Sequence, residues 1–378
     1  MPKIDLSTYC PLPFNGYDSR LKWVCCVYQS PTDQNLKSHR EIKNSPKIIQ
    51  MQQDLLNGIK SADCQSCWGN ESSNSPSLRT SILKKLNFDQ LDSDELIQQV
   101  IDDKKLRYLW IDSGSVCNLA CRSCSYMYST SLFKEHKDRY NHTPITGIKK
   151  TDVQSLMQED YSSIAEIMVL GGEPFLNLDH IQIIDEIVKQ GHSNNADLKY
   201  FTNGTVKLPH AIERQIPHFK DFKLQLSIDA VGQQFEYIRT NGQWSSIESN
   251  LNYLLELQKL HPNIILSVQI TISVLNILYL GELMQWLANF KVESIIQWPV
   301  TDPAEYTFNI LNDQQKAYVV QYLDRLPYNF SGIAAHVTST TFDPEALSKF
   351  YQEVSWTEKY KKLALHDYLP RLDDLLKM

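Results

Sequence analysis

The chain has 378 residues, of which 42% are hydrophobic, so we expect a packed globular protein rather than a long disordered one. Its formal net charge is -7 and no block of Lys and Arg occurs, which argues against a nucleic-acid partner. No segment has the apolar length of a signal peptide or a bilayer span, so we expect a cytoplasmic protein with no membrane partner.

The first 80 residues hold five of the eight cysteines, and residues 17–26 read as a hairpin turn followed by a strand. A helix is predicted from Pro46, with Ser45 as its N-cap. Its apolar positions form one face: Ile48, Ile49, Leu55, Leu56 and Ile59. We assign residues 1–80 to a small Cys-rich α+β module and residues 81–104 to a helical linker.

From residue 105 the sequence alternates between short apolar runs and helical patterns. The predicted strands are 106–115, 165–172, 198–204, 222–229, 264–273 and 293–300. Among the helices between them, the one after residue 178 is given Asp179 as its N-cap. Six βα units in a row predict an α/β fold with a parallel sheet, which right-handed crossovers curl into a partial (β/α)6 TIM-like barrel over residues 105–305. Residues 306–378 read as a helical C-terminal extension.

Three cysteines follow the first predicted strand of this region directly. Cys117, Cys121 and Cys124 have the spacing C-x3-C-x2-C, with no fourth cysteine nearby. Three thiolates hold three corners of a 4Fe–4S cube and leave the fourth iron open to a small molecule, whereas ferredoxin runs have a different spacing. A structural zinc site would need four closed ligands, which this triplet does not supply. In parallel α/β folds, ligands bind beyond the carboxyl ends of the strands, where this triplet lies.

At the triplet the chain resembles the radical S-adenosylmethionine (SAM) enzymes. The resemblance implies that the open iron chelates SAM and that an electron from the cluster cleaves it. The 5′-deoxyadenosyl radical so formed would abstract hydrogen from a substrate C–H. Many members carry an aromatic residue just before the third cysteine, near adenine, whereas this chain has Ser123 there.

The later strand ends offer candidate SAM contacts. The sequence LGGEPFL ends the second strand, and a Gly-Gly pair lets the backbone approach a ligand closely. The resemblance assigns this motif to the SAM amino group, Ser227 and Asp229 to the ribose, and Asn276 to adenosine. Two further residues have open alternatives. Asn203 either contacts SAM or forms a turn, and Trp298 either flanks adenine or packs in the core. The candidate cofactor-binding residues are therefore Gly171, Gly172, Glu173, Asn203, Ser227, Asp229, Asn276 and Trp298.

The five early cysteines resemble the twitch module, a short relative of the SPASM domain that binds one auxiliary iron–sulfur cluster. They are Cys10, Cys25, Cys26, Cys64 and Cys67. Neighbouring residues on a strand point to opposite faces, so Cys25 and Cys26 cannot both be ligands of the same cluster. We favour Cys25 as a ligand with Cys10, Cys64 and Cys67; Cys26 then packs, binds substrate or donates a hydrogen atom. A zinc site remains the alternative, and the spacing does not decide between 2Fe–2S and 4Fe–4S.

The sequence thus predicts a radical SAM oxidoreductase or transferase-like enzyme with two iron–sulfur clusters. Relatives with twitch or SPASM modules often modify ribosomally made peptides, so we expect a peptide or natural-product precursor as substrate; a sugar or small metabolite is the alternative. A flavodoxin- or ferredoxin-type protein would donate the electron. The alternative interpretation, from a different functional class, is a non-catalytic interaction protein with structural zinc.

Overall fold

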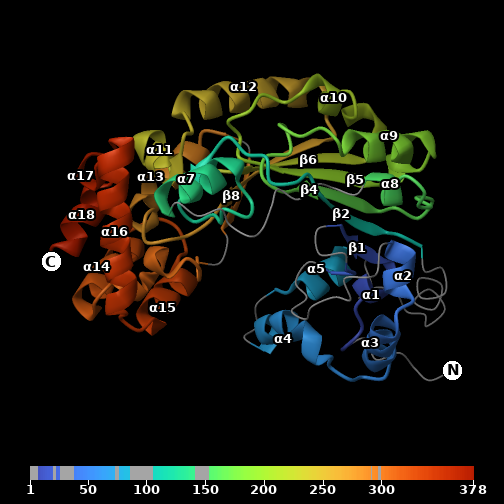
Figure 1. The fold of residues 1–378 in the computed structure, drawn as a ribbon, viewed down its shortest axis with the longest axis horizontal. Coiled ribbons are helices and arrows are strands. Elements are labelled where there is room, and N and C mark those ends of the chain that lie inside the picture. Colours follow the sequence, from blue (N-terminus) through green and yellow to red (C-terminus); the bar gives the residue numbers. More distant parts are fainter. Residues whose placement is uncertain are drawn as a thin grey trace.

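A seven-stranded sheet organises the chain, in the order β1-β2-β4-β5-β6-β8-β9 (Figure 1). The computed structural model describes residues 7–19, 23–25, 38–72, 76–85, 105–140, 153–290, 292–296 and 299–378. All six pairings in this sheet are parallel. The strands are β1 (Gly16–Asp18), β2 (Tyr108–Asp112), β4 (Glu166–Leu170), β5 (Asp197–Thr202), β6 (Asp221–Ser227), β8 (Ile264–Ile270) and β9 (Glu293–Ile296). The prediction of an α/β fold with a parallel sheet is therefore confirmed.

One face of the sheet is apolar and covered by helices. Tyr200 on β5 packs against Phe222 on β6 and against His180, which precedes α9. Helices α9, α10 and α12 lie along this side of the sheet in Figure 1. The helices that connect the strands are α7 (Thr130–Tyr140), α8 (Val153–Leu156), α9 (Ile181–Lys189), α10 (His210–Glu213), α11 (Gly232–Ile238), α12 (Trp244–Leu260) and α13 (Leu280–Leu287).

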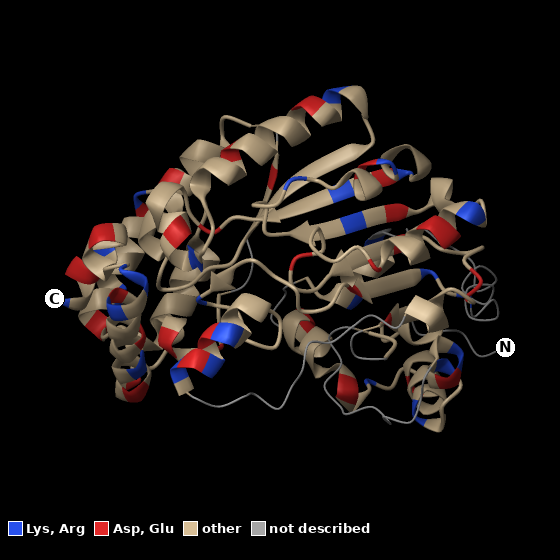
Figure 2. Ribbon diagram, turned by 45° about the horizontal axis from the view of Figure 1, so that its top comes forward, with Lys and Arg blue, Asp and Glu red and all other residues tan. Residues whose placement is uncertain are grey.

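The opposite face of the sheet carries charged side chains, which is unusual because parallel sheets are normally apolar on both faces. Lys199 and Lys223 are paired in register on β5 and β6, so they lie side by side on this face. Lys223 forms an ion pair with Asp197 at 2.6 Å. Figure 2 shows basic and acidic residues within the strands themselves. This face therefore offers a polar lining to a ligand.

The N-terminal segment is built around α3 and supplies the first strand of the sheet. Its helices are α1 (Leu12–Asn15), α2 (His39–Lys43), α3 (Pro46–Leu56), α4 (Gln65–Ser72) and α5 (Leu78–Lys85). The predicted hairpin is present as a single antiparallel bridge between Asp18 and Trp23. The predicted apolar face of α3 is partly wrong: Ile49 is 39% exposed, whereas Met51 is buried.

Residues after 300 form helices that gather at the end of the molecule away from the N-terminal segment (Figure 1). They are α14 (Asp313–Asp324), α15 (Ser331–Ser339), α16 (Pro344–Lys361), α17 (Leu365–Tyr368) and α18 (Pro370–Leu376). No helix in the described part of the chain combines the length and apolar character needed to cross a membrane. Cys26, Trp298 and most of the predicted linker 81–104 lie outside the described residues.

Candidate functional site

The cysteine triplet lies in the loop that follows β2, at the carboxyl edge of the sheet. Within this loop, β3 (Ala120–Cys121) pairs in antiparallel fashion with β7 (Arg239–Thr240). The pairing sets Cys121 opposite Arg239. The backbone N–H of Cys117 donates to Thr130 Oγ1 at 3.1 Å, which ties the loop to the start of α7. The triplet is thus held by β7 and by α7.

Gly171 and Gly172 bring the end of β4 into contact with the triplet loop. Gly171 has φ +136°, a conformation that favours glycine. A Cβ atom at Gly172 would lie 2.5 Å from the carbonyl oxygen of Val116, which leaves no room for a side chain. The N–H of Gly172 donates to the Gly114 carbonyl at 2.7 Å, and that of Glu173 donates to the Val116 carbonyl at 2.7 Å. The glycine pair therefore serves close backbone packing against the loop that leads to Cys117.

Glu173 is fully buried and joins the ends of β4 and β5. Its carboxylate accepts hydrogen bonds from Thr202 Oγ1 at 2.9 Å and from the Asn203 N–H at 2.7 Å. Burial raises the pKa of Glu173 to about 7, although its hydrogen bonds favour the ionised form and lower the pKa. Both carboxylate oxygens thus have protein donors, and the predicted contact of Glu173 with SAM stays a prediction.

Asn203 lies beside the triplet. Its amide Nδ2 donates to Asn118 Oδ1 at 2.9 Å and lies 3.9 Å from Cys117 Sγ. The N–H of Leu119 also donates to Cys117 Sγ, at 3.5 Å. Hydrogen bonds to the sulfur ligands stabilise an iron–sulfur cluster and tune its potential.

Asp229 and Arg239 form a buried ion pair that faces Cys121. Arg239 Nη2 lies 2.8 Å from Asp229 Oδ2, and its Nη1 lies 3.9 Å from Cys121 Sγ. Burial raises the pKa of Cys121 to about 12, opposed by Arg239 and assisted by the thiols of Cys124 and Cys117. The three thiols are therefore close enough to influence one another. Asp229 was predicted to contact the ribose; its carboxylate binds Arg239 and the N–H of Thr271.

The remaining predicted SAM contacts lie at the ends of β6 and β8. Ser227 is the last residue of β6 and is half-buried. Asn276 is fully buried, and its Nδ2 donates to the carbonyl oxygens of Asp229 at 3.0 Å and Thr271 at 2.9 Å. The side chain of Asn276 thus joins the loops after β6 and β8, and a contact between it and adenosine stays a prediction.

The donor set at the triplet fits an iron–sulfur cluster: three thiols, with N–H groups directed at the sulfurs of Cys117 and Cys121. Within the described part of the chain, no three His, Cys, Asp or Glu side chains converge tightly enough to hold a single metal ion. A cube of four irons is wider than one ion, so its ligands stand farther apart.

A second group of thiols lies in the N-terminal segment. Four cysteines line one small cavity there: Cys10, Cys25, Cys64 and Cys67. Burial raises the pKa of Cys64 to about 11, and the Cys67 thiol adds to this shift. These are the four residues favoured as ligands of the auxiliary cluster, and four sulfur donors around one cavity fit such a cluster.

Arg79 lines the same cavity. Its guanidinium binds Glu71 through Nε at 3.0 Å and donates through Nη1 to the Tyr9 carbonyl at 3.0 Å. It also lies 4.9 Å from the centre of the Trp68 ring. Arg79 therefore places a positive charge beside the four thiols, where a cluster with thiolate ligands would carry negative charge.

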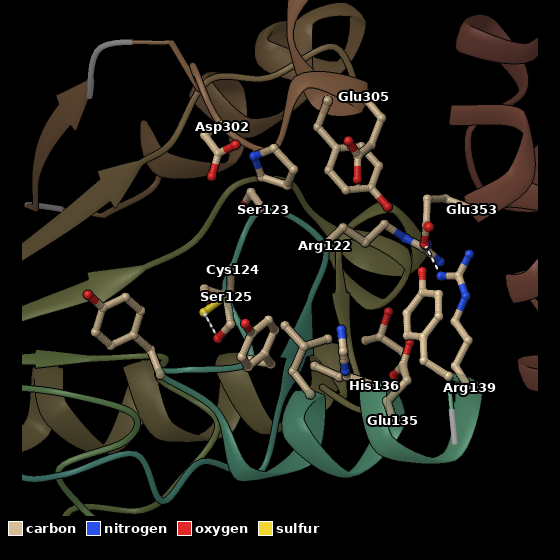
Figure 3. A pocket seen from close by; sticks show the side chains of 18 of the residues that line it. Arg122, Ser123, Cys124, Ser125, Glu135, His136, Arg139, Asp302, Glu305 and Glu353 are labelled. Carbon is tan, nitrogen blue, oxygen red and sulfur yellow. Dashed lines mark hydrogen bonds and ion pairs between the residues drawn. The ribbon is translucent and has the colours of Figure 1, made fainter. Parts of the chain in front are cut away.

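A larger cavity of about 560 Å³ lies on the side of Cys124 (Figure 3). The triplet loop forms one wall with Arg122, Ser123 and Cys124, and α7 forms another. The third wall comes from residues after 300, including Asp302 and Glu353. The helical C-terminal region thus contributes directly to a cavity beside the triplet.

Three arginines near the thiols were not singled out from the sequence: Arg79, Arg122 and Arg239. Arg79 and Arg239 lie outside any motif, whereas Arg122 lies within the triplet, between Cys121 and Cys124. Arg239 lies next to Cys121 only because β3 pairs with β7, a contact across 118 residues. For Arg239, the turn sequence Thr-Asn-Gly that follows it was the available signal, since Asn241 has a positive φ of 73°.

No protein-family model matches the sequence, and no curated protein matches it. Among solved structures, native anSMEcpe with bound AdoMet is 13% identical over 68% of this chain and 67% of that chain, with a TM-score of 0.39. SuiB from Streptococcus suis bound to its precursor peptide SuiA is 13% identical over 75% of this chain and 68% of that chain, with a TM-score of 0.39. The matches span about two thirds of those chains.

Proposed function

We propose that this protein is a radical SAM enzyme. The observation that carries the proposal is the C-x3-C-x2-C triplet beyond the carboxyl end of β2, packed against the Gly171–Gly172 turn. Cys117, Cys121 and Cys124 would hold three irons of a 4Fe–4S cluster and leave the fourth for SAM. When bound, the cluster would supply the electron that cleaves SAM to a 5′-deoxyadenosyl radical, which removes hydrogen from a substrate C–H.

The chain's own residues would orient SAM around the open iron. The backbone of Gly171 and Gly172 would receive the SAM amino group together with Glu173. Ser227, Asp229, Asn203, Asn276 and Trp298 remain the proposed contacts at the later strand ends. Residues 105–305 would form the partial (β/α)6 barrel, with the charged face around Lys199 and Lys223 toward the substrate.

The N-terminal module would hold an auxiliary cluster through Cys10, Cys25, Cys64 and Cys67, as a twitch module does. Four thiols around one cavity support this assignment. A cluster with a protein thiolate on every iron has no open coordination site, so its proposed role is to accept an electron from the substrate radical rather than to anchor the substrate. The proposed substrate is a peptide, and a flavodoxin- or ferredoxin-type protein is the proposed donor.

Anaerobic reconstitution followed by metal analysis and mass spectrometry tests the proposal. We expect about eight irons per chain if both clusters are of the 4Fe–4S type. Adding SAM should change the electron paramagnetic resonance spectrum of the reduced protein, and reduction should then yield 5′-deoxyadenosine. Cys117→Ala should abolish this product, whereas the matched control Ser123→Ala in the same loop should retain it. A colourless protein with one or two zinc ions would instead support a zinc-binding interaction protein.

A further inference from the structure

Two glutamines are hydrogen-bonded to each other on the charged face of the sheet. Gln225 on β6 follows Lys223 by two residues, so both side chains point to this face. Gln225 Nε2 donates to Oε1 of Gln269 on the neighbouring strand β8. On the other side, the register sets Phe201 of β5 opposite Gln225. Three adjacent strands therefore fix the position of this amide pair.

One atom of the pair is buried without a partner. Gln225 is 2% exposed, and its Oε1 accepts no hydrogen bond from any residue that the structure describes. Native proteins leave few buried polar atoms in this state, because an unmade hydrogen bond in the interior costs stability. Gln225 Oε1 can therefore accept a hydrogen bond from a donor that the chain itself does not supply.

Gln269 supplies the complementary group. It is half-buried, its Oε1 is occupied by Gln225, and its Nε2 donates to nothing in the described part of the chain. The pair thus presents one acceptor, from Gln225, and one donor, from Gln269. Turning both amides over would exchange the two roles and would still leave one donor and one acceptor.

The pair lies close to the residues that contact the triplet. Asn203, whose Nδ2 is 3.9 Å from Cys117 Sγ, comes two residues after Phe201. Because a strand advances about 3.3 Å per residue, the amide pair lies roughly 7 Å below the row of the sheet that contains Asn203. Two residues of an extended peptide span this distance. A backbone held by the glutamines can therefore place a neighbouring residue at the carboxyl edge of the sheet.

The arrangement of donor and acceptor favours a peptide backbone as the ligand. The two glutamines share a single hydrogen bond, so Gln225 Oε1 and Gln269 Nε2 are separate groups that are not bonded to each other. In an extended chain, one residue directs its own N–H and C=O to the same side, as the hydrogen-bonded pairs of an antiparallel ladder do. Such a residue can donate to Gln225 and accept from Gln269 at the same time.

We propose that Gln225 and Gln269 bind the backbone of one extended residue of the substrate. Gln225 Oε1 accepts its N–H, and Gln269 Nε2 donates to its C=O. The assignment of the ligand as substrate rests on the proposed function, because the triplet would then hold the cluster at the adjacent edge of the sheet. The half-buried ring of Phe201, opposite Gln225, gives the flat peptide group an apolar surface to pack against.

Saturation-transfer difference NMR with the anaerobically reconstituted full chain tests this site. The probe is N-acetylalanine-N′-methylamide. Its matched partner is O-acetyllactic acid N′-methylamide, in which an ester oxygen replaces the alanine N–H. We expect the alanine probe to bind and the lactate probe to bind roughly fivefold more weakly, because one hydrogen bond is lost. In Gln225→Met the alanine probe should weaken to the level of the lactate probe, so that the two probes no longer differ.

Two controls separate a lost contact from a lost fold. Gln225→Met should keep the iron content of the wild type and should raise the midpoint temperature of unfolding, because it removes a buried acceptor that has no partner. Gln321→Met makes the same exchange at an exposed position on α14 and should bind both probes as the wild type does.

Three results would overturn the proposal: an alanine probe that does not bind, equal binding of the two probes to the wild type, or a Gln225→Met protein that still distinguishes them. Propionamide identifies the source of the amide. If this primary amide binds as tightly as the alanine probe, the site belongs to an Asn or Gln side chain, and weaker binding assigns it to the backbone.

The binding test and the proposed function can fail separately. Discrimination between the probes that depends on Gln225, in a protein that forms no 5′-deoxyadenosine, would keep the amide site and reject the radical SAM proposal. Formation of 5′-deoxyadenosine by a protein that binds the two probes equally would reject the amide site alone.

Discussion

Arg122 and Thr357 join the triplet loop to the C-terminal helices. Arg122 Nη1 donates to Thr357 Oγ1 at 2.8 Å across 235 residues of sequence, and its guanidinium lies 4.0 Å from the centre of the Tyr237 ring. Because Arg122 lies between Cys121 and Cys124, α16 is attached directly to the loop that carries the thiols. A structural change in α16 can therefore affect the triplet loop directly, without being transmitted through the sheet.

Replacing Thr357 with Val should loosen this attachment. Thr357 is 1% exposed, so losing its hydroxyl leaves an arginine donor poorly satisfied in a buried place, and we expect a loss of about 1–3 kcal/mol in the free energy of unfolding. Hydrogen–deuterium exchange should increase in α16 and in residues 120–125 together. Thr338→Val, at an exposed site on α15, should change stability by less than about 0.5 kcal/mol. Unchanged exchange in the triplet loop would contradict the coupling.

Glu173 should give the protein a pH-dependent stability. Burial raises its pKa from the ordinary 4.5 to about 7. Because the pKa of this carboxyl is higher in the folded than in the unfolded state, the folded state is favoured while the carboxyl is protonated. This contribution to the free energy of unfolding is fully present below pH 4.5 and is lost as the pH rises toward 7. Over this window the wild type should lose about 3 kcal/mol relative to Glu173→Gln. Urea unfolding at several pH values measures the difference. Glu248→Gln, at an exposed position, is the control. Parallel pH profiles of the wild type and Glu173→Gln would refute the assignment of this pH dependence to Glu173.

Arg239 should raise the reduction potential of a cluster held by the triplet. Its positive charge lies 3.9 Å from Cys121 Sγ, and a nearby cation favours the reduced, more negative form. In Arg239→Gln we expect the midpoint to move to more negative potential by roughly 60 mV, a tenfold change for one electron. A redox titration followed by electron paramagnetic resonance measures the shift. Arg214→Gln, which removes an exposed arginine paired with Asp185, should leave the potential unchanged.

The two adjacent cysteines of the N-terminal segment should respond differently to substitution. Cys25 lines the cavity with Cys10, Cys64 and Cys67, so Cys25→Ala should remove the auxiliary cluster and lower the iron content from about eight to about four. Cys26→Ala should keep the full iron content. Neither variant should lose the ability to cleave SAM. Loss of iron in Cys26→Ala with full iron in Cys25→Ala would reverse the ligand assignment.

Cys64 provides a related test of what the auxiliary cluster does. In Cys64→Ala, SAM cleavage should continue while product formation stops, because the substrate radical would lack its electron acceptor. Mass spectrometry of the reaction mixture separates the two readouts. Normal product from this variant would remove the electron-acceptor role and leave the triplet proposal untouched.

The sequence predicts those parts of the fold that depend on local periodicity. Strands such as β5 and β6 were expected within one or two residues, because buried residues such as Leu198, Tyr200 and Leu224 alternate with polar ones. β1 was missed because three residues are too few to show a period. It forms through pairing with β2 and through the bridge between Asp18 and Trp23. Asp179 was wrong as an N-cap, since α9 begins at Ile181 after His180, which is buried against Tyr200.

Site residues could be predicted where their spacing along the sequence indicates the chemistry. They could not be predicted where their role depends on a tertiary contact. The triplet and the glycine pair could be identified from the sequence, because thiol spacing and steric freedom are local properties. The contact of Arg239 could not be identified, because Arg239 approaches Cys121 from a distant segment. Arg122 lies within the triplet, but its contact with Thr357 on α16 is equally distant in the sequence. Asn276 could be located near a strand end from the sequence, but the contacts of its amide could not. The amide joins the loops after β6 and β8.

The pairing of β1 with β2 makes the N-terminal segment part of the main sheet rather than an appendage. Gly16–Asp18 cover the outer edge of β2 at Tyr108–Trp110. A version of the protein that begins after residue 85 would leave these backbone groups of β2 without hydrogen-bond partners, and such bare edges recruit strands from other molecules. Truncation at that point should therefore yield oligomers or aggregates even if every residue of the triplet site is retained.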